Sequence, residues 1–103
     1  MNIRFEYLYR DSGNYKNWGS IVFSNPQNEK VEVLTERVRS CLIDHAFFVA
    51  AKAGVPDLHF DNFDEELDHG WHEFAFVEYT LESPNDTQGR NISQFLLDLK
   101  SAH

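Results

Sequence analysis

Apolar and polar residues alternate along the first ten residues of the chain. Ile, Phe and two Tyr occupy the odd positions from Ile3 to Tyr9, and charged residues fill most of the even positions. A period of two is typical of a strand with one face in the core. A second β-branched run, Ser20–Ser24, follows a loop over Asp11–Gly19 that is rich in Gly, Asn and Ser. We therefore expect an antiparallel hairpin with a long tip that contains Tyr15 and Trp18.

Two stretches have the three-to-four-residue spacing of an amphipathic helix. In the first, which begins after Asn28, the apolar positions are Leu34, Val38, Cys41 and Leu42. In the second, behind a candidate N-cap at Asn91, they are Ile92, Phe95, Leu96 and Leu99. We expect a helix of about 12 to 14 residues in the first stretch and a shorter terminal helix in the second.

Two further strands are predicted between these helices. Residues 46–52 are mostly apolar without a single apolar helical face, as in a strand buried on both sides. The alanines of this run and Gly54 after it leave open the alternative of one helix from 31 to 53. The strongest strand pattern is Trp71–Glu82, which is apolar on both faces near its middle. This pattern predicts a central strand and places Trp71, Phe74 and Phe76 in the core.

The predicted order of elements is ββαββα within a single domain, 1–103. Paired strands and two helices indicate the α+β class: a two-layer sandwich with a mostly antiparallel sheet of about four strands and both helices on one face. The single Cys41 excludes an internal disulfide framework and is typical of a small buried hydrophobe. Because the chain shows no signal peptide and no apolar run of about 20 residues, we expect a soluble cytoplasmic protein.

Charge is distributed unevenly along the chain. The net charge is −8, and between Ala53 and Gly89 ten acidic residues occur without a single Lys or Arg. Such a surface repels nucleic-acid backbones and anionic membranes, which require basic side chains. The charge pattern therefore favours a cation or a basic protein as partner.

Carboxylates, histidines and aromatic residues are concentrated in one segment, Pro56–Phe76. Our first hypothesis is a small acidic binding protein, of the kind that includes immunity proteins, antitoxins and nucleic-acid mimics, acting as a monomer or homodimer. In such surfaces charge steers association and aromatic anchors supply much of the affinity. The predicted partner-binding residues are Asp57, Phe60, Asp61, Phe63, Asp64, Glu65, Glu66, Asp68 and Trp18. Phe60 and Phe63 are equally compatible with a role as core anchors.

The alternative hypothesis is a metal-binding module or a metal-dependent hydrolase. Its candidate ligands for a divalent metal are His59, His69, His72 and Glu73, since imidazole and carboxylate are ligands that such ions accept. The spacing of His69 and His72 does not match the His-Glu-x-x-His pattern, and the acidic residues do not match a calcium loop. Hydrogen bonding of these histidines to neighbouring acids is the simpler interpretation. The metal hypothesis therefore depends on whether the histidines converge in space.

Other enzyme classes find no support in the sequence. The chain has no phosphate-binding glycine loop, and none of its serines lies in a Gly-x-Ser-x-Gly context. Paired carboxylates of a hydrolase are conceivable, but no pair is distinguished from the other acids. The sequence thus favours a binding protein without a cofactor over an enzyme.

Three segments, FEYLYRDSGNYKNWG, PDLHF and ELDHGWHEF, resemble a group of short uncharacterised bacterial proteins of similar length. The resemblance covers most of the chain. It implies a bacterial or phage origin, and it implies no activity, cofactor or site residue.

Overall fold

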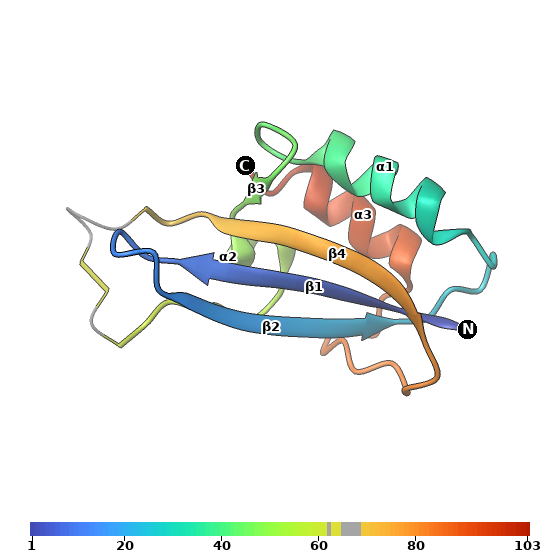
Figure 1. Cartoon of the computed structure of the whole chain (residues 1–103). Coiled ribbons are helices and arrows are strands. Elements are labelled where there is room, and N and C mark those ends of the chain that lie inside the picture. The colour runs from blue at the N-terminus through green and yellow to red at the C-terminus, as the bar shows by residue number, and fades with distance from the viewer. Residues whose placement is uncertain (62, 65–68) are drawn as a thin grey trace.

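The computed structural model describes residues 1–61, 63–64 and 69–103 and shows an α+β fold with a four-stranded antiparallel sheet (Figure 1). Its elements are β1 (Asn2–Arg10), β2 (Lys16–Phe23), α1 (Val31–Cys41), β3 (Phe47–Phe48), α2 (Ala50–Ala53), β4 (His72–Thr80) and α3 (Ile92–Lys100). The strand order is β2-β1-β4-β3, and α1 and α3 lie side by side on one side of the sheet. The predicted α+β class with an antiparallel sheet of four strands is confirmed. None of the described helices has the length and apolar character needed to cross a bilayer.

The hairpin of β1 and β2 has a shorter tip than the sequence predicted. Strand β2 begins at Lys16, so Trp18 lies within the sheet opposite Leu8 and not in the turn. The side chain of Asp11 accepts a hydrogen bond from the Tyr15 backbone (2.9 Å), and Asn14 adopts a positive φ of 65°. These local interactions close the turn within a few residues, because Asp and Asn tolerate turn conformations that other residues avoid.

Strand β4 contains an irregularity that reverses the expected direction of some side chains. Glu6 of β1 faces Phe76, whereas the next residue, Tyr7, faces Phe74, so one residue of β4 is bulged between them. Phe74 is buried as predicted, but Phe76 and Trp71 are each 41% exposed, and their predicted core positions are wrong. For Phe76 the reason is that a bulge shifts the alternation of side chains by one position beyond it. Position 77 takes the core place that simple alternation gave to position 76. Trp71 lies before β4, next to the inward-facing His72, and its ring stacks on that of Phe47.

The segment between α1 and β4 differs from both interpretations of the sequence. A continuous helix from 31 to 53 is wrong, because α1 ends at Cys41 and both Asp44 and His45 have positive φ values of 51° and 60°. The predicted strand over 46–52 is correct only for β3, the two residues Phe47–Phe48. The alanines that follow form the helical turn α2, which Gly54 ends in the left-handed conformation (φ 72°).

The core is formed by the helix-facing side of the sheet together with α1 and α3. The predicted inward positions of β1, Ile3, Phe5, Tyr7 and Tyr9, are all at most 1% exposed. Phe95 of α3 packs against Phe5 and Phe23, with ring centroids 4.9 and 4.4 Å apart. The predicted N-cap of α3 is also confirmed, since Asn91 and Gln94 form a reciprocal capping box.

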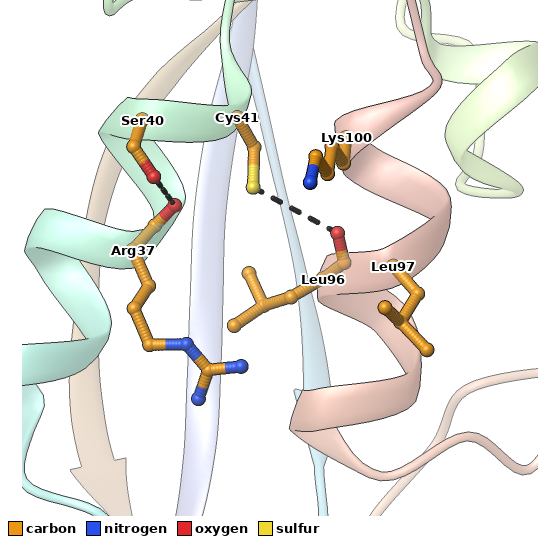
Figure 2. A pocket seen from close by; sticks show the side chains of 6 residues that line it. All are labelled: Arg37, Ser40, Cys41, Leu96, Leu97 and Lys100. Atoms are coloured by element: carbon orange, nitrogen blue, oxygen red, sulfur yellow. Dashed lines mark hydrogen bonds between the residues drawn. The ribbon is translucent and has the colours of Figure 1, made fainter.

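A shallow depression of about 230 Å³ lies between α1 and α3 (Figure 2). It is lined by Arg37, Ser40, Cys41, Leu96, Leu97 and Lys100. Burial raises the pKa of the Cys41 thiol, although Ser40, Lys100 and Arg37 act in the opposite direction. A raised pKa makes the thiol a poor nucleophile at neutral pH. Cys41 was predicted to be a small buried hydrophobe, and the structure shows it half-buried.

One buried cation joins the loop before α3 to the end of α2. Arg90, only 8% exposed, donates hydrogen bonds to the carboxylate of Asp86 and to the carbonyl oxygens of Ala53 (2.7 Å) and Gly54 (3.0 Å). A further bond reaches Asp98 at 2.9 Å. Burial alone would raise the pKa of Asp86, but hydrogen bonds from Arg90 outweigh it and lower that pKa. The sequence pattern did not single out this network.

Candidate metal site

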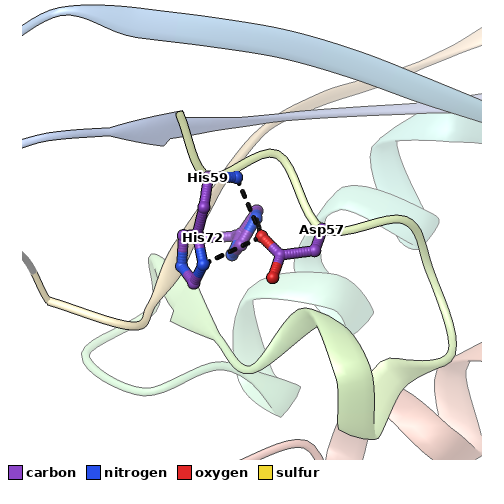
Figure 3. Close-up of side chains that lie close together, drawn as sticks. All are labelled: Asp57, His59 and His72. Atoms are coloured by element: carbon purple, nitrogen blue, oxygen red, sulfur yellow. Dashed lines mark hydrogen bonds and ion pairs between the residues drawn. The ribbon is translucent and has the colours of Figure 1, made fainter. Parts of the chain in front are cut away.

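The candidate site lies where the loop after α2 crosses the start of β4. His72 is the first residue of β4, and its side chain is 1% exposed on the core face of the sheet. Asp57 and His59 belong to the loop that follows Pro56. Figure 3 shows the three side chains directed toward one another. The site therefore combines one residue fixed by the sheet with two residues supplied by a loop.

The three side chains lie close enough together to serve as ligands of one metal ion. Oδ1 of Asp57 lies 3.1 Å from Nδ1 of His59 and 3.5 Å from Nε2 of His72. One potential ligand atom from each residue lies within 4.8 Å of the other two. Two ligands of a tetrahedral zinc ion, each bonded at about 2.0–2.1 Å, are separated by about 3.3 Å. The three residues can thus contact one ion after small displacements.

Backbone and tyrosine hydrogen bonds hold the loop against the sheet. The hydroxyl of Tyr7 donates to the carbonyl oxygen of Pro56 (2.7 Å), and the backbone N–H of Leu58 donates to Nε2 of His72 (2.9 Å). On the other side, Nδ2 of Asn17 donates to the Leu58 carbonyl oxygen (3.1 Å). Because residues on both sides of Asp57 are anchored in this way, its carboxylate is kept beside His72.

The two imidazoles occupy an apolar, aromatic environment. The ring of His59 stacks on Phe63 with centroids 4.1 Å apart and meets the edge of Tyr9 at 4.4 Å. Nε2 of His59 and Nδ1 of His72 are buried without a hydrogen-bond partner in the part of the chain that the structure describes. Burial lowers the pKa of His72 to about 4, even though the charge of Asp57 acts to raise it. His72 is therefore neutral at physiological pH, the form in which imidazole binds metals.

The low pKa of His72 predicts an acid-dependent loss of stability in the metal-free protein. Its folded pKa of about 4 lies below the ordinary value of 6.5, so the unfolded chain binds a proton first as the pH falls. Stability should be highest above pH 6.5 and should decrease between pH 6.5 and 4, by up to about 3 kcal/mol from this group. Urea unfolding in a chelating buffer across this range measures the effect.

The variant His72→Gln separates this effect from the titration of other groups. Its free energy of unfolding should depend less on pH between 6.5 and 4 than that of the native chain. His45→Gln, which changes an exposed histidine in the turn before β3, is the matched control. Equal pH profiles for the native chain and His72→Gln would contradict the prediction.

The structure brings together two of the four predicted metal ligands and separates the other two. His59 and His72 converge, but the group they form with Asp57 includes neither His69 nor Glu73. Nδ1 of His69 accepts a hydrogen bond from the Trp71 backbone (3.2 Å). Glu73 points to the other face of β4 and forms an ion pair with Arg10 at 2.8 Å. The third ligand atom comes from Asp57, which the sequence predicted as a partner-binding residue and not as a metal ligand.

The residues predicted to bind a partner fall into four groups. The carboxylates of Asp57, Asp61 and Asp64 are exposed, whereas Phe60 and Phe63 are half-buried and lie close to the ring of Tyr9. Trp18 is 53% exposed in β2. Glu65, Glu66 and Asp68 lie outside the described residues. The aromatic side chains Phe60 and Phe63 thus pack within the site and present only part of their surface.

Comparison with known proteins assigns no family: no protein-family model, curated protein or solved structure matches the chain. The function therefore has to be inferred from the side chains themselves. Among the described side chains, the cluster of Asp57, His59 and His72 gives the clearest indication of a function.

Proposed function

We propose that this protein is a metal-binding module that holds one divalent ion, Zn²⁺ by preference, through Asp57, His59 and His72. The supporting observation is the convergence of one carboxylate oxygen and two imidazole nitrogens within 4.8 Å. Histidines 13 residues apart in the chain, one in a loop and one in a strand, do not meet through local geometry alone. Their meeting needs the tertiary fold, in particular the anchoring of the loop by Tyr7 and Asn17.

The donor set favours zinc over the common alkaline-earth ions. Ca²⁺ and Mg²⁺ prefer shells made entirely of oxygen, whereas imidazole suits Zn²⁺ and its neighbours in the first transition row. Three protein ligands leave a fourth tetrahedral position open, as in zinc sites that keep a water molecule. Asp57, with a side chain 58% exposed, marks the solvent side of the cluster. An open position of this kind is also what a metal-dependent hydrolase uses to activate water.

Metal binding replaces one existing interaction at each imidazole. Nδ1 of His59 lies 3.1 Å from Oδ1 of Asp57, and the ion would take the place of this direct contact. Nε2 of His72 now accepts the Leu58 N–H, and this nitrogen must release that donor to bind an ion. An intramolecular hydrogen bond contributes about 1 kcal/mol net, while zinc bound to structural sites contributes on the order of 10 kcal/mol. The exchange therefore favours the bound ion even if several hydrogen bonds of the loop are lost.

Equilibrium dialysis of the chelator-treated chain against Zn²⁺, followed by elemental analysis, tests the proposal. We expect one ion per chain. Titration with Co²⁺ should in addition produce the visible absorption bands of a tetrahedral site. A chain that retains no zinc at micromolar free concentration would refute the metal function.

A basic protein partner is the second candidate function. It is supported by the exposure of Asp57, Asp61 and Asp64 on one loop, in the region of the chain that has no Lys or Arg. Charge complementarity of this kind acts mainly on the rate of association and weakens with salt. Unlike the metal, such a partner would not require the two imidazoles.

We expect the chain to bind poly-L-lysine, as a probe for basic partners, with an affinity that decreases as the salt concentration rises. The double variant Asp61→Lys, Asp64→Lys should weaken this binding by about tenfold or more. The double variant Glu32→Lys, Glu36→Lys, at exposed positions of α1, is the charge-matched comparison. Binding that is insensitive to salt, or equally reduced by both changes, would argue against docking at this loop. Fluorescence anisotropy of labelled poly-L-lysine provides the measurement.

A further inference from the structure

Strand β2 forms one edge of the sheet, and part of this edge is already closed by the chain itself. The backbone N–H of Val22 donates to Oδ1 of Asn85 (2.8 Å), and the Val22 carbonyl oxygen accepts from the Asn85 backbone N–H (3.0 Å). Two residues further on, the Ser24 carbonyl oxygen accepts from the N–H of Ile92 (2.9 Å). The even-numbered residues of β2 therefore direct their backbone groups away from β1, toward the free edge.

The same alternation places three further residues of β2 at the edge. Lys16, Trp18 and Ser20 direct their N–H and C=O groups outward, and all three residues are exposed. No hydrogen bond to these backbone groups occurs among the residues that the structure describes. Within the described part of the chain, three donors and three acceptors of the window Lys16–Ser20 thus remain unpaired. Unpaired edge groups of this kind are a template for pairing with another strand.

We propose that the window Lys16–Ser20 pairs with the same window of a second copy, in antiparallel register around a twofold axis at Trp18. In this register Trp18 faces Trp18 of the second copy, and Lys16 faces Ser20 of the second copy. All three residue pairs are hydrogen-bonded pairs, with two bonds each and about six in total. The window is self-complementary, as an interface of two identical patches requires.

The charge distribution favours a second copy as the occupant. Each chain has a net charge of −8, so two copies repel each other over most of their surfaces. From Ser12 to Asn28, however, the chain contains no Asp or Glu. Two copies that meet along β2 bring no carboxylates of this stretch together, and the single cation, Lys16, faces the neutral Ser20.

Trp18 supplies the apolar contact at the centre of this interface. Its side chain is 53% exposed, and its partner in the hairpin is Leu8, on the side of the sheet that faces away from α1 and α3. Across the twofold axis the two indole rings become cross-strand neighbours, a contact that stabilises paired strands. Because only three residue pairs form, the interface is small, and we expect a weak dimer that appears at high protein concentration.

Light scattering and sedimentation of the chelator-treated chain, from micromolar to millimolar concentration, test the proposal independently of any metal. We expect the mass to rise from that of one chain toward that of two. In the same samples, hydrogen exchange at the amides of Trp18 and Ser20 should slow with concentration. The amide of Gly19, which points toward β1, is an internal reference.

Two variants locate the interface. Ser20→Pro removes one backbone N–H donor at the edge from each copy, and proline is tolerated at the edge of a sheet. Trp18→Lys replaces the pair of indole rings by two like charges. Each change should weaken dimerisation by about tenfold or more. Phe76→Lys changes an exposed aromatic residue of β4 on the same face of the sheet as Trp18, and it should leave dimerisation unchanged. A mass of one chain at all concentrations, or a dimer that persists in both β2 variants, would overturn the proposal.

Discussion

In the variant His72→Gln, zinc should no longer raise the melting temperature of the protein. In the native chain, an ion present at about 100 times its dissociation constant adds about 2.7 kcal/mol to the free energy of unfolding. For a domain of this size, that gain corresponds to a rise of about 10 °C or more. Glutamine has a volume close to that of histidine and can still accept the Leu58 N–H, so the metal-free fold is preserved while the imidazole ligand is lost. Differential scanning calorimetry with and without Zn²⁺ measures the shift.

Variants at the other histidines distinguish a specific site from general binding to imidazoles. His59→Gln and Asp57→Asn should also lose the zinc-dependent shift, because each removes one of the three converging ligand atoms. His69→Gln and His45→Gln should retain it. The comparison is made within each variant, so a change in the stability of the metal-free protein does not affect the conclusion. A shift of equal size in all four histidine variants would contradict the proposed ligand set.

The second large effect is expected at Arg90, where the variant Arg90→Ala should lower the free energy of unfolding by about 3–5 kcal/mol. The change leaves the carboxylate of Asp86, whose side chain is 2% exposed, buried without its counterion. It also leaves the carbonyl oxygens of Ala53 and Gly54 without their donor and removes a cation from the ring of Phe95, 5.2 Å away. Since small domains have a total stability of about 5–15 kcal/mol, this loss is a large fraction of it. Urea unfolding at neutral pH gives the value.

Two further substitutions show that the loss at Arg90 comes from its buried geometry and not from its charge alone. Arg90→Lys keeps the charge but cannot place donors on both carbonyl oxygens and on Asp86. Its free energy of unfolding should therefore lie between those of Arg90→Ala and the native chain. Arg37→Ala removes an exposed arginine paired with Glu29 and should cost at most about 1 kcal/mol. If Arg90→Ala were no more destabilising than Arg37→Ala, the hydrogen bonds of Arg90 would not contribute to the stability of the fold.

The metal proposal assigns a role to an otherwise costly arrangement. Each of the two imidazoles buries one nitrogen that has no hydrogen-bond partner among the described residues, and this reduces stability because a buried polar atom loses its contacts with water. A bound ion would occupy the other nitrogen of each ring, Nδ1 of His59 and Nε2 of His72, and would fix the proton on the nitrogen that lacks a partner. It would also join the loop containing Asp57 to strand β4. The cluster therefore fits a protein whose loop is stabilised by an ion.

The local period of apolar residues was sufficient to predict most of the regular structure. Burial of alternate residues in β1, the apolar face of α1 and the capping box of α3 all depend on neighbours within a few positions, and such neighbours are visible in the sequence. The sequence also indicated the right kind of chemistry, by placing histidines and carboxylates close together between Pro56 and Phe76. It identified His59 and His72 as candidates, but it could not separate them from His69 and Glu73.

Only the tertiary structure determined which side chains meet. One bulged residue in β4 exposes Phe76, and a single turn of helix replaces the second half of a predicted strand. The donor set of the site joins Asp57 and His59 to His72 across the loop, and Arg90 reaches Ala53 and Gly54 over 37 and 36 positions. Such contacts depend on the register between strands and on where a loop is anchored. A shift of one residue in a strand turns a ligand away from the cluster, as it does for Glu73, because neighbouring side chains in a strand point to opposite faces.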